Sequence, residues 1–189
     1  NEYVSSDQLA SILKDVVASV TNQKLDLIAF DCCLGASLEH AYLFADTTHY
    51  LVGCQNCALP DGLEYHGFIT RLAQGAEPRD VAQGIVEDYG AYYAAKETKG
   101  LYTLSAIDCN QSLAVKNAVD ALSNLLLRAI LDEPSLKQLF KEVLHAQSPH
   151  FCFVPMYTDL FTICHELNEA AQSGKFDTLN HELVTEILA

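Results

Sequence analysis

The stretch Leu25-Asp-Leu-Ile-Ala-Phe-Asp-Cys-Cys-Leu-Gly-Ala-Ser37 is the most informative part of the chain, because a run of strand-forming residues ends abruptly at an acid and two cysteines. The nearly continuous apolar run up to Phe30 is typical of a strand buried on both faces of a parallel sheet. In such sheets, ligands and reacting groups gather at the carboxyl ends of the strands. Cys33 therefore lies at the position expected for a catalytic nucleophile. A buried structural thiol is the alternative interpretation, since free cysteine is among the most buried residue types.

The composition is that of one globular domain. Half of the 189 residues are apolar, enough for a substantial core, so we expect a single domain over residues 1–189. No apolar run approaches the roughly 20 residues of a membrane span, and the first residues lack the basic and apolar parts of a signal peptide. These residues therefore do not assign the protein to a cellular compartment. Because the chain begins at Asn1 without methionine, we expect a processed product or a trimmed chain.

The charge is strongly acidic, with a formal net value of −14 from 25 acids and 11 bases. Such a charge repels nucleic acid and anionic membranes and favours cationic ligands. We expect neither nucleic acid nor a membrane as a partner, and a basic substrate or partner instead. An acidic surface that only promotes solubility is the alternative.

Hydrophobic periodicity and capping residues predict an alternation of helices and strands, the pattern of an α/β sandwich. Strands are expected at residues 25–30, 49–53, 101–107 and 151–154. Helices are expected at residues 5–20, 37–45, 64–73, 78–95, 110–131, 134–145, 159–172 and 177–188.

The residues Phe30-Asp-Cys-Cys-Leu-Gly35 resemble the nucleophile block of the caspase-like clan of cysteine peptidases. In that block an apolar strand is followed by an acid or glutamine, a small residue and the cysteine. The following helix adds partial positive charge that favours thiolate. Cys33 is the expected nucleophile because Cys32 takes the small-residue position, where we expect it to pack.

Within that clan the chain resembles the clostripain family. Residues 27–42 resemble its nucleophile block and next helix, and Pro60-Asp-Gly62, Leu104-Ser-Ala-Ile-Asp108 and Tyr157-Thr-Asp-Leu160 resemble later blocks in the same order. The resemblance implies a caspase-like three-layer α-β-α sandwich with a mostly parallel central sheet, in a bacterial protease. Two departures stand out. Val52-Gly-Cys-Gln-Asn-Cys57 replaces a usual Ser-Glu pair, which bears on substrate binding, and Gly35 replaces a methionine.

The general base is missing from the expected place. Clan members take it from a His-Gly that ends the strand before the cysteine strand, and residues 1–30 contain no histidine. Relatives are often activated by internal cleavage between those strands. We therefore expect Asn1 to follow such a processing site, with the histidine and part of the oxyanion hole on an upstream light chain of the same precursor. A pseudo-peptidase is the alternative. His40, His49 and His66 are expected to have surface or packing roles.

Asp31 and Asp61 match the positions of two acids that, by the resemblance, line the pocket for the residue before the scissile bond. A carboxylate there binds a guanidinium or an ammonium, so the resemblance implies cleavage of basic peptides or proteins after arginine or lysine. The alternative is that Asp31 caps the turn that follows it and Asp61 serves the Pro-Asp-Gly turn.

The implied reaction is thiolate attack on the peptide carbonyl, followed by hydrolysis of an acyl-enzyme. Two other classes stay open: a non-catalytic binding module with the same fold, and a redox or metal-binding protein that uses Cys54-Gln-Asn-Cys57. Some relatives need calcium, but the acids here form no recognisable calcium loop, so no cofactor is assigned. By the same resemblance, a secreted or periplasmic location is an expectation.

Overall fold

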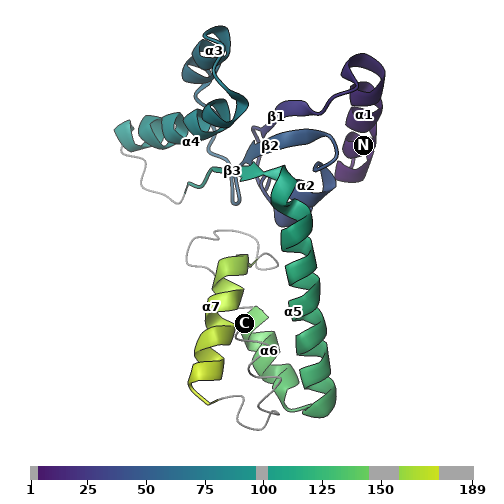
Figure 1. Cartoon of the computed structure of the whole chain (residues 1–189). Helices are drawn as coiled ribbons and strands as arrows, with labels where there is room; N and C mark the ends of the chain where they lie inside the picture. The colour runs from purple at the N-terminus through teal and green to yellow at the C-terminus, as the bar shows by residue number, and fades with distance from the viewer. Residues whose placement is uncertain (1–3, 97–101, 145–157, 175–189) are drawn as a thin grey trace. The chain divides into compact units, whose positions relative to one another are not determined.

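The computed structural model describes residues 4–96, 102–144 and 158–174 (Figure 1). The chain divides into two compact units, residues 1–114 and 115–189. We describe each unit by itself, and a single domain over the whole chain stays a prediction.

The first unit is built on a three-stranded sheet with the order β1-β2-β3. These strands are Leu25–Phe30, Thr48–Gly53 and Ser105–Asp108. β1 and β2 are parallel, with Leu27 opposite Tyr50, whereas β3 runs antiparallel to β2. An α/β fold is thus confirmed, but the described sheet is mixed. Neither a mostly parallel sheet nor a three-layer sandwich is confirmed by these strands.

Local sequence signals set the helix boundaries in this unit. The Ser5 side chain begins α1, Ser6–Val16, through a capping box with Gln8, and a π-helical turn continues it as η1, Val17–Thr21. Ser37 caps the short α2, Leu38–Leu43. Glu64 caps α3, Tyr65–Ala73, and a proline opens α4, Pro78–Ala95. The predicted helices in this unit are thus confirmed, with small shifts at their ends.

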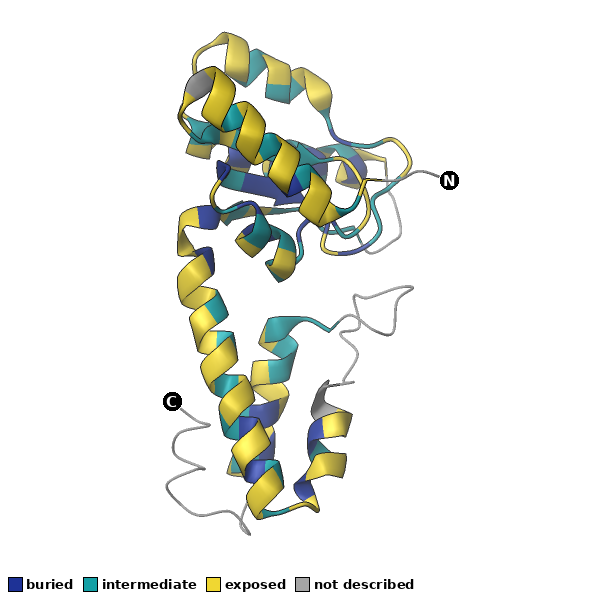
Figure 2. Cartoon of the chain, turned by 90° about the vertical axis from the view of Figure 1, so that its right-hand side faces the viewer, coloured by how far each residue is buried: buried dark blue, intermediate teal, exposed yellow. Residues whose placement is uncertain are grey.

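Apolar clusters pack on both faces of the sheet, because successive strand residues point to opposite faces. Leu51 is fully buried in a cluster with α1 and α2, whereas its neighbour Val52 is fully buried against α4 (Figure 2). β1 differs from the expectation of a strand buried on both faces. Its residues are only half-buried and Asp26 is exposed, because β1 lies at the edge of the described sheet.

Four tyrosine rings at the carboxyl-terminal half of α4 form a further part of this core, which we call the tyrosine cluster. The Tyr89 and Tyr93 ring centroids are 4.6 Å apart, and Tyr92 and Tyr102 each lie within 6 Å of Tyr93. The Tyr93 hydroxyl donates a hydrogen bond of 3.0 Å to the carbonyl of Gly62. The tyrosine cluster therefore ties α4 to the loop that follows β2.

The second unit is helical in its described part. The first unit ends with a 3-10 turn, η2, Cys109–Gln111, and the start of α5, Ser112–Asp132. The second unit holds the rest of α5, then α6, Leu136–Leu144, and α7, Leu160–Gln172. Its core joins all three helices through Leu126, Ala129, Leu136, Phe140, Leu167 and Ala170. These helices match the predicted ones closely. The predicted strand at 151–154 and helix at 177–188 lie outside the described residues. No described helix has the length and apolar character that a membrane crossing needs.

Two glycines let the ends of β1 and β2 approach closely. A Cβ at Gly53 would lie 2.8 Å from the carbonyl carbon of Gly35 and 2.9 Å from the amide nitrogen of Ala36. Both neighbours are backbone atoms, so a methyl group cannot be accommodated by turning a side chain. The end of β2 therefore requires glycine for packing.

We expect Gly53→Ala to lower the free energy of unfolding by about 1–3 kcal/mol, because overpacking forces the backbone apart. Gly90→Ala on α4 is the matched control, since a Cβ there meets nothing within 4 Å. That change should be neutral or stabilise by up to about 1 kcal/mol. Urea unfolding of both variants measures the difference. Equal stability of the two variants would contradict the proposed close approach.

Candidate functional site

Cys33 lies in the tight turn between the end of β1 and the start of α2. Its residue is exposed, and its sulfur accepts a hydrogen bond of 3.2 Å from the backbone N–H of Ala58. A thiolate accepts such a hydrogen bond more strongly than a neutral thiol. The turn therefore presents a sulfur that is both accessible and held by a backbone donor.

The loop after β2 fixes the backbone of this turn. Leu34 donates its N–H to the carbonyl of Asn56 at 2.9 Å, and Ala36 donates to the carbonyl of Cys54 at 3.1 Å. Leu34 has a φ of 60°, the left-handed region that branched side chains rarely adopt. Backbone strain of this kind persists only where the surroundings hold it, and it clusters at active sites. The strain directly after Cys33 is thus a sign of function.

Asp31 faces the same loop from the other side. Its Oδ2 accepts hydrogen bonds from the Tyr65 hydroxyl at 2.7 Å and from the Leu63 N–H at 3.3 Å. The bond to Asp31 raises the pKa of the Tyr65 hydroxyl, because the carboxylate stabilises the protonated phenol. Gly62 makes this approach possible, since its φ is 71° and a Cβ there would clash with Asp31 Oδ2. Leu63 belongs to the loop after β2 and Tyr65 begins α3, so Asp31 fixes the end of this loop as well as lying before the nucleophile turn.

Asp61 lies in the turn that the Gly62 N–H closes onto the carbonyl of Leu59 at 3.0 Å. It is half exposed, and its Oδ2 lies 2.6 Å from the ammonium of Lys96. This hydrogen bond and charge pair lower the pKa of Asp61. The structure therefore gathers Cys33, Asp31 and Asp61 around one loop, residues 54–64.

The other cysteines near this loop differ from Cys33. Cys32, which we expected to pack, is an exposed residue, although partial desolvation of its sulfur raises the pKa of its thiol. Cys54 is buried 3.9 Å from the Tyr89 hydroxyl, and burial raises the pKa of its thiol to about 11. Cys57 is half-buried. Among the described residues, no three histidine, cysteine or acidic side chains group as a metal site would require.

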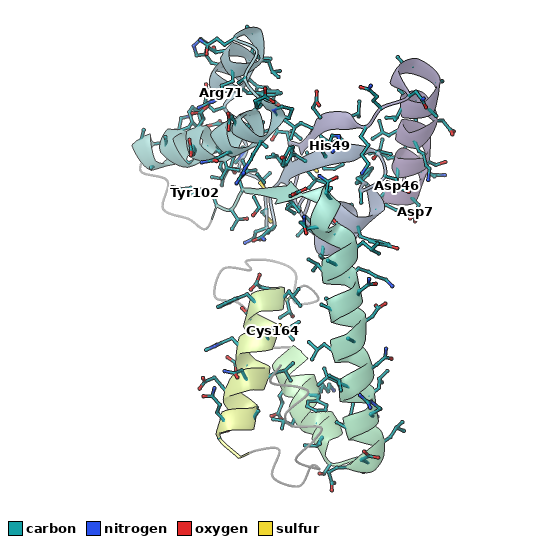
Figure 3. All side chains as sticks on the ribbon, viewed as in Figure 1. Asp7, Asp46, His49, Arg71, Tyr102 and Cys164 are labelled. Atoms are coloured by element: carbon teal, nitrogen blue, oxygen red, sulfur yellow. The ribbon has the colours of Figure 1, made fainter. Side chains whose placement is uncertain are left out.

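His40 and His49 contact residues other than Cys33, in agreement with the surface or packing roles expected of them. His40 stacks on Phe30 with ring centroids 5.7 Å apart, and its Nε2 lies 2.8 Å from the hydroxyl of Ser6. His49 on β2 lies 3.4 Å from the side-chain oxygen of Asn110 (Figure 3). His66 is exposed on α3. Within the described ranges, no histidine hydrogen-bonds the sulfur of Cys33.

A hollow of about 610 Å³ lies away from these residues, between α4 and strands β2 and β3. Its lining includes Tyr50, Arg79, Glu87 and Asp108, and none of the three predicted site residues. We place the candidate site at the loop, because the exposed sulfur and its backbone donor lie there.

Sequence reasoning missed the residues that support this site. Tyr65 and Lys96 contact Asp31 and Asp61 across 34 and 35 residues of chain. No local pattern marks such pairs. The only signal in the sequence is that each lies near the end of a predicted helix.

Comparison with known proteins identifies a family and a fold. A family model described as the clostripain family matches residues 4–182. A B. fragilis cysteine protease is 19% identical over 66% of this chain and 50% of its own, with a TM-score of 0.53. A clostripain from Bacteroides thetaiotaomicron, solved with the peptide inhibitor BTN-VLTK-AOMK, is 20% identical over 88% of this chain and 72% of its own, with a TM-score of 0.51.

An inactive zymogen C11 protease from Parabacteroides distasonis is 17% identical over 99% of this chain, with a TM-score of 0.51. The chain spans 49% of that zymogen and about half of the B. fragilis protease. No curated protein sequence matches. At these identities the solved structures establish a shared fold.

Burial predicts a marked order of thiol reactivity. At pH 8, a pKa of about 11 leaves roughly one Cys54 thiol in a thousand ionised, and burial has the same effect on Cys109. We expect iodoacetamide to modify exposed Cys33 and Cys164 well before Cys54 and Cys109 in the folded chain, as followed by timed peptide mass mapping. In urea the four rates should converge. Rapid labelling of Cys54 in the folded chain would contradict the buried position of that thiol.

Proposed function

Because the chain belongs to the clostripain family, we propose that it is the nucleophile-bearing part of a cysteine endopeptidase that cleaves after arginine or lysine. One observation carries the proposal: the exposed sulfur of Cys33, held by the Ala58 N–H, lies beside the loop that also holds Asp31 and Asp61. This arrangement supplies a nucleophile and two carboxylates that can bind a basic side chain, and the catalytic histidine must come from elsewhere.

In the proposed reaction, the Cys33 thiolate attacks the carbonyl carbon of the scissile bond. The Cys33 backbone N–H is one donor to the oxyanion, and loss of such a donor typically costs on the order of 100-fold or more in rate. A histidine protonates the leaving amine, and water then hydrolyses the acyl-enzyme with that histidine as base. The fragment after the scissile bond leaves with a new N-terminal amine. Hydrolysis of the acyl-enzyme then releases the other fragment as a carboxylic acid and regenerates the Cys33 thiol.

The histidine is proposed to lie on an upstream light chain of the same precursor. Two features support this partner. His40 and His49 make their side-chain contacts with residues other than Cys33, and β1, the strand that leads to Cys33, lies at an edge of the described sheet. An edge strand offers backbone N–H and C=O groups to another strand. Processing from a zymogen is part of the proposal, since one solved neighbour is an inactive zymogen C11 protease.

The preference for basic residues rests on the two acids. Asp31 is an exposed residue, and the only hydrogen-bond donors that it meets in the described structure are uncharged. Its carboxylate can therefore receive a guanidinium as a bidentate partner or an ammonium as a point charge. Asp61 adds a second carboxylate from the loop that Asp31 contacts. Calcium stays unassigned, and a secreted or periplasmic location stays a prediction.

Active-site labelling tests the nucleophile. We expect a biotinylated peptide acyloxymethyl ketone with lysine next to the ketone to add one label to the assembled peptidase, on Cys33, as read by intact mass and peptide mapping. Cys33→Ala should remove the label, and Cys32→Ala should keep it, although the two thiols are neighbours. Labelling of Cys32 instead, or no label on an assembled and folded protein, would refute the proposed nucleophile.

Substrate choice tests Asp31. Asp31→Asn keeps the hydrogen-bond acceptor but removes the charge, so we expect kcat/KM for lysine and arginine substrates to fall by about 10-fold or more. The rate for a norleucine substrate of the same length should change much less. Asp26→Asn, at an exposed position on the strand that precedes Asp31, is the matched control for loss of one negative charge. An equal loss for all three substrates would assign Asp31 a structural role.

A further inference from the structure

Asp61 and Tyr92 together form a site for a cation, and a lysine of the same chain fills it. The Lys96 ammonium lies 2.6 Å from Asp61 Oδ2 and 4.3 Å from the centroid of the Tyr92 ring. A carboxylate and an aromatic face are two groups that bind ammonium and guanidinium ions in proteins. The side chain of a substrate lysine or arginine carries the same chemistry as the group now bound.

This cation site is joined to the candidate active site through the backbone. Asp61 precedes Gly62, whose Cα approaches the carboxylate of Asp31 and whose carbonyl accepts the Tyr93 hydroxyl. Lys96 directly follows α4, the helix that carries Tyr92 and Tyr93. The end of α4 is thus fixed to the turn between Ala58, which contacts the sulfur of Cys33, and Leu63, which contacts Asp31.

Asp61, in the loop, and Asp31, which contacts the end of the loop, differ in their electrostatic state. Asp61 is paired with a cation, whereas no ion pair among the described residues includes Asp31. Pairing lowers the pKa of Asp61 and raises that of Lys96, so both groups stay charged at neutral pH. A basic substrate therefore meets one carboxylate without a cation and one that is already neutralised.

We propose that Lys96 is a specificity-determining residue that competes with the substrate: it occupies the position that Asp61 and Tyr92 offer to a basic side chain. This inference rests on the proposed function, which makes Asp61 part of the substrate pocket. The Lys96 and Asp61 side chains are 45% and 50% exposed, so the pair is weak enough to be displaced. We expect an exposed ion pair and an exposed cation–π contact from Lys96 to lower the affinity of the site for a basic substrate side chain by about two- to tenfold.

The kinetic test uses Lys96→Met in the assembled peptidase, with substrates that carry lysine, arginine or norleucine before the scissile bond. Methionine keeps the apolar stem and removes the charge. We expect KM to fall two- to tenfold for the lysine and arginine substrates, with kcat unchanged and norleucine unaffected. In an Asp61→Asn background the effect of Lys96→Met should shrink, because only the contact with Tyr92 remains. Lys14→Met, which breaks the exposed pair between Lys14 and Asp46, controls for net charge and should change no KM.

Binding provides a readout that does not depend on catalysis. In an NMR titration of the 189-residue chain with Nα-acetyl-lysine amide, Lys96→Met should bind more tightly than the wild type by a similar factor, and Nα-acetyl-norleucine amide should show no difference. Unchanged affinity and KM would overturn the inference, as would an equal gain for norleucine, which indicates a loosened loop. Absence of any preference for basic substrates in the wild type would instead count against the proposed function, and the titration would then decide the role of Lys96.

Discussion

The backbone hydrogen bonds between the turn after β1 and the loop after β2 are the interaction on which the candidate site depends. Parallel pairing brings the carboxyl ends of these two strands to one edge of the sheet, and the bonds from Leu34 and Ala36 extend that pairing past the strands. The surrounding backbone thus holds Leu34 in its left-handed conformation and keeps Gly35 and Gly53 in close contact. The sulfur of Cys33 is positioned by this framework rather than by packing of its own side chain.

The two carboxylates near the loop after β2, Asp31 and Asp61, differ in whether a cation neutralises them. In a chain with a net charge of −14, acids near a binding site are expected, and their number alone says little. Their partners are more informative. Asp31 is held by a tyrosine hydroxyl and a backbone N–H, which fix its position without neutralising it, whereas Asp61 is neutralised by Lys96. The two carboxylates can therefore contribute unequally to the recognition of a cation.

Much of the fold could be predicted from local sequence, and the rest depended on contacts between distant residues. Ser5, Ser37 and Asp159 begin helices through their own side chains, so a short window around each was sufficient. The direction of β3 was not predictable in this way, because pairing is decided by the partner strand. The half-buried state of β1 has the same origin, since burial reflects what lies beside a strand. At the site, Cys33 could be predicted from the strand end, but the contacts of Tyr65 and Lys96 could not.

The position of the tyrosine cluster gives the molecule an optical property. The chain has nine tyrosines and no tryptophan, so its near-ultraviolet emission comes from phenol rings alone. Four of those rings lie together on and near α4, one under the Lys96 ammonium and another bonded to Gly62. A change in the loop that carries Asp61 therefore alters the surroundings of nearly half the chromophores. The region beside the nucleophile carries its own spectroscopic reporter, without an added dye.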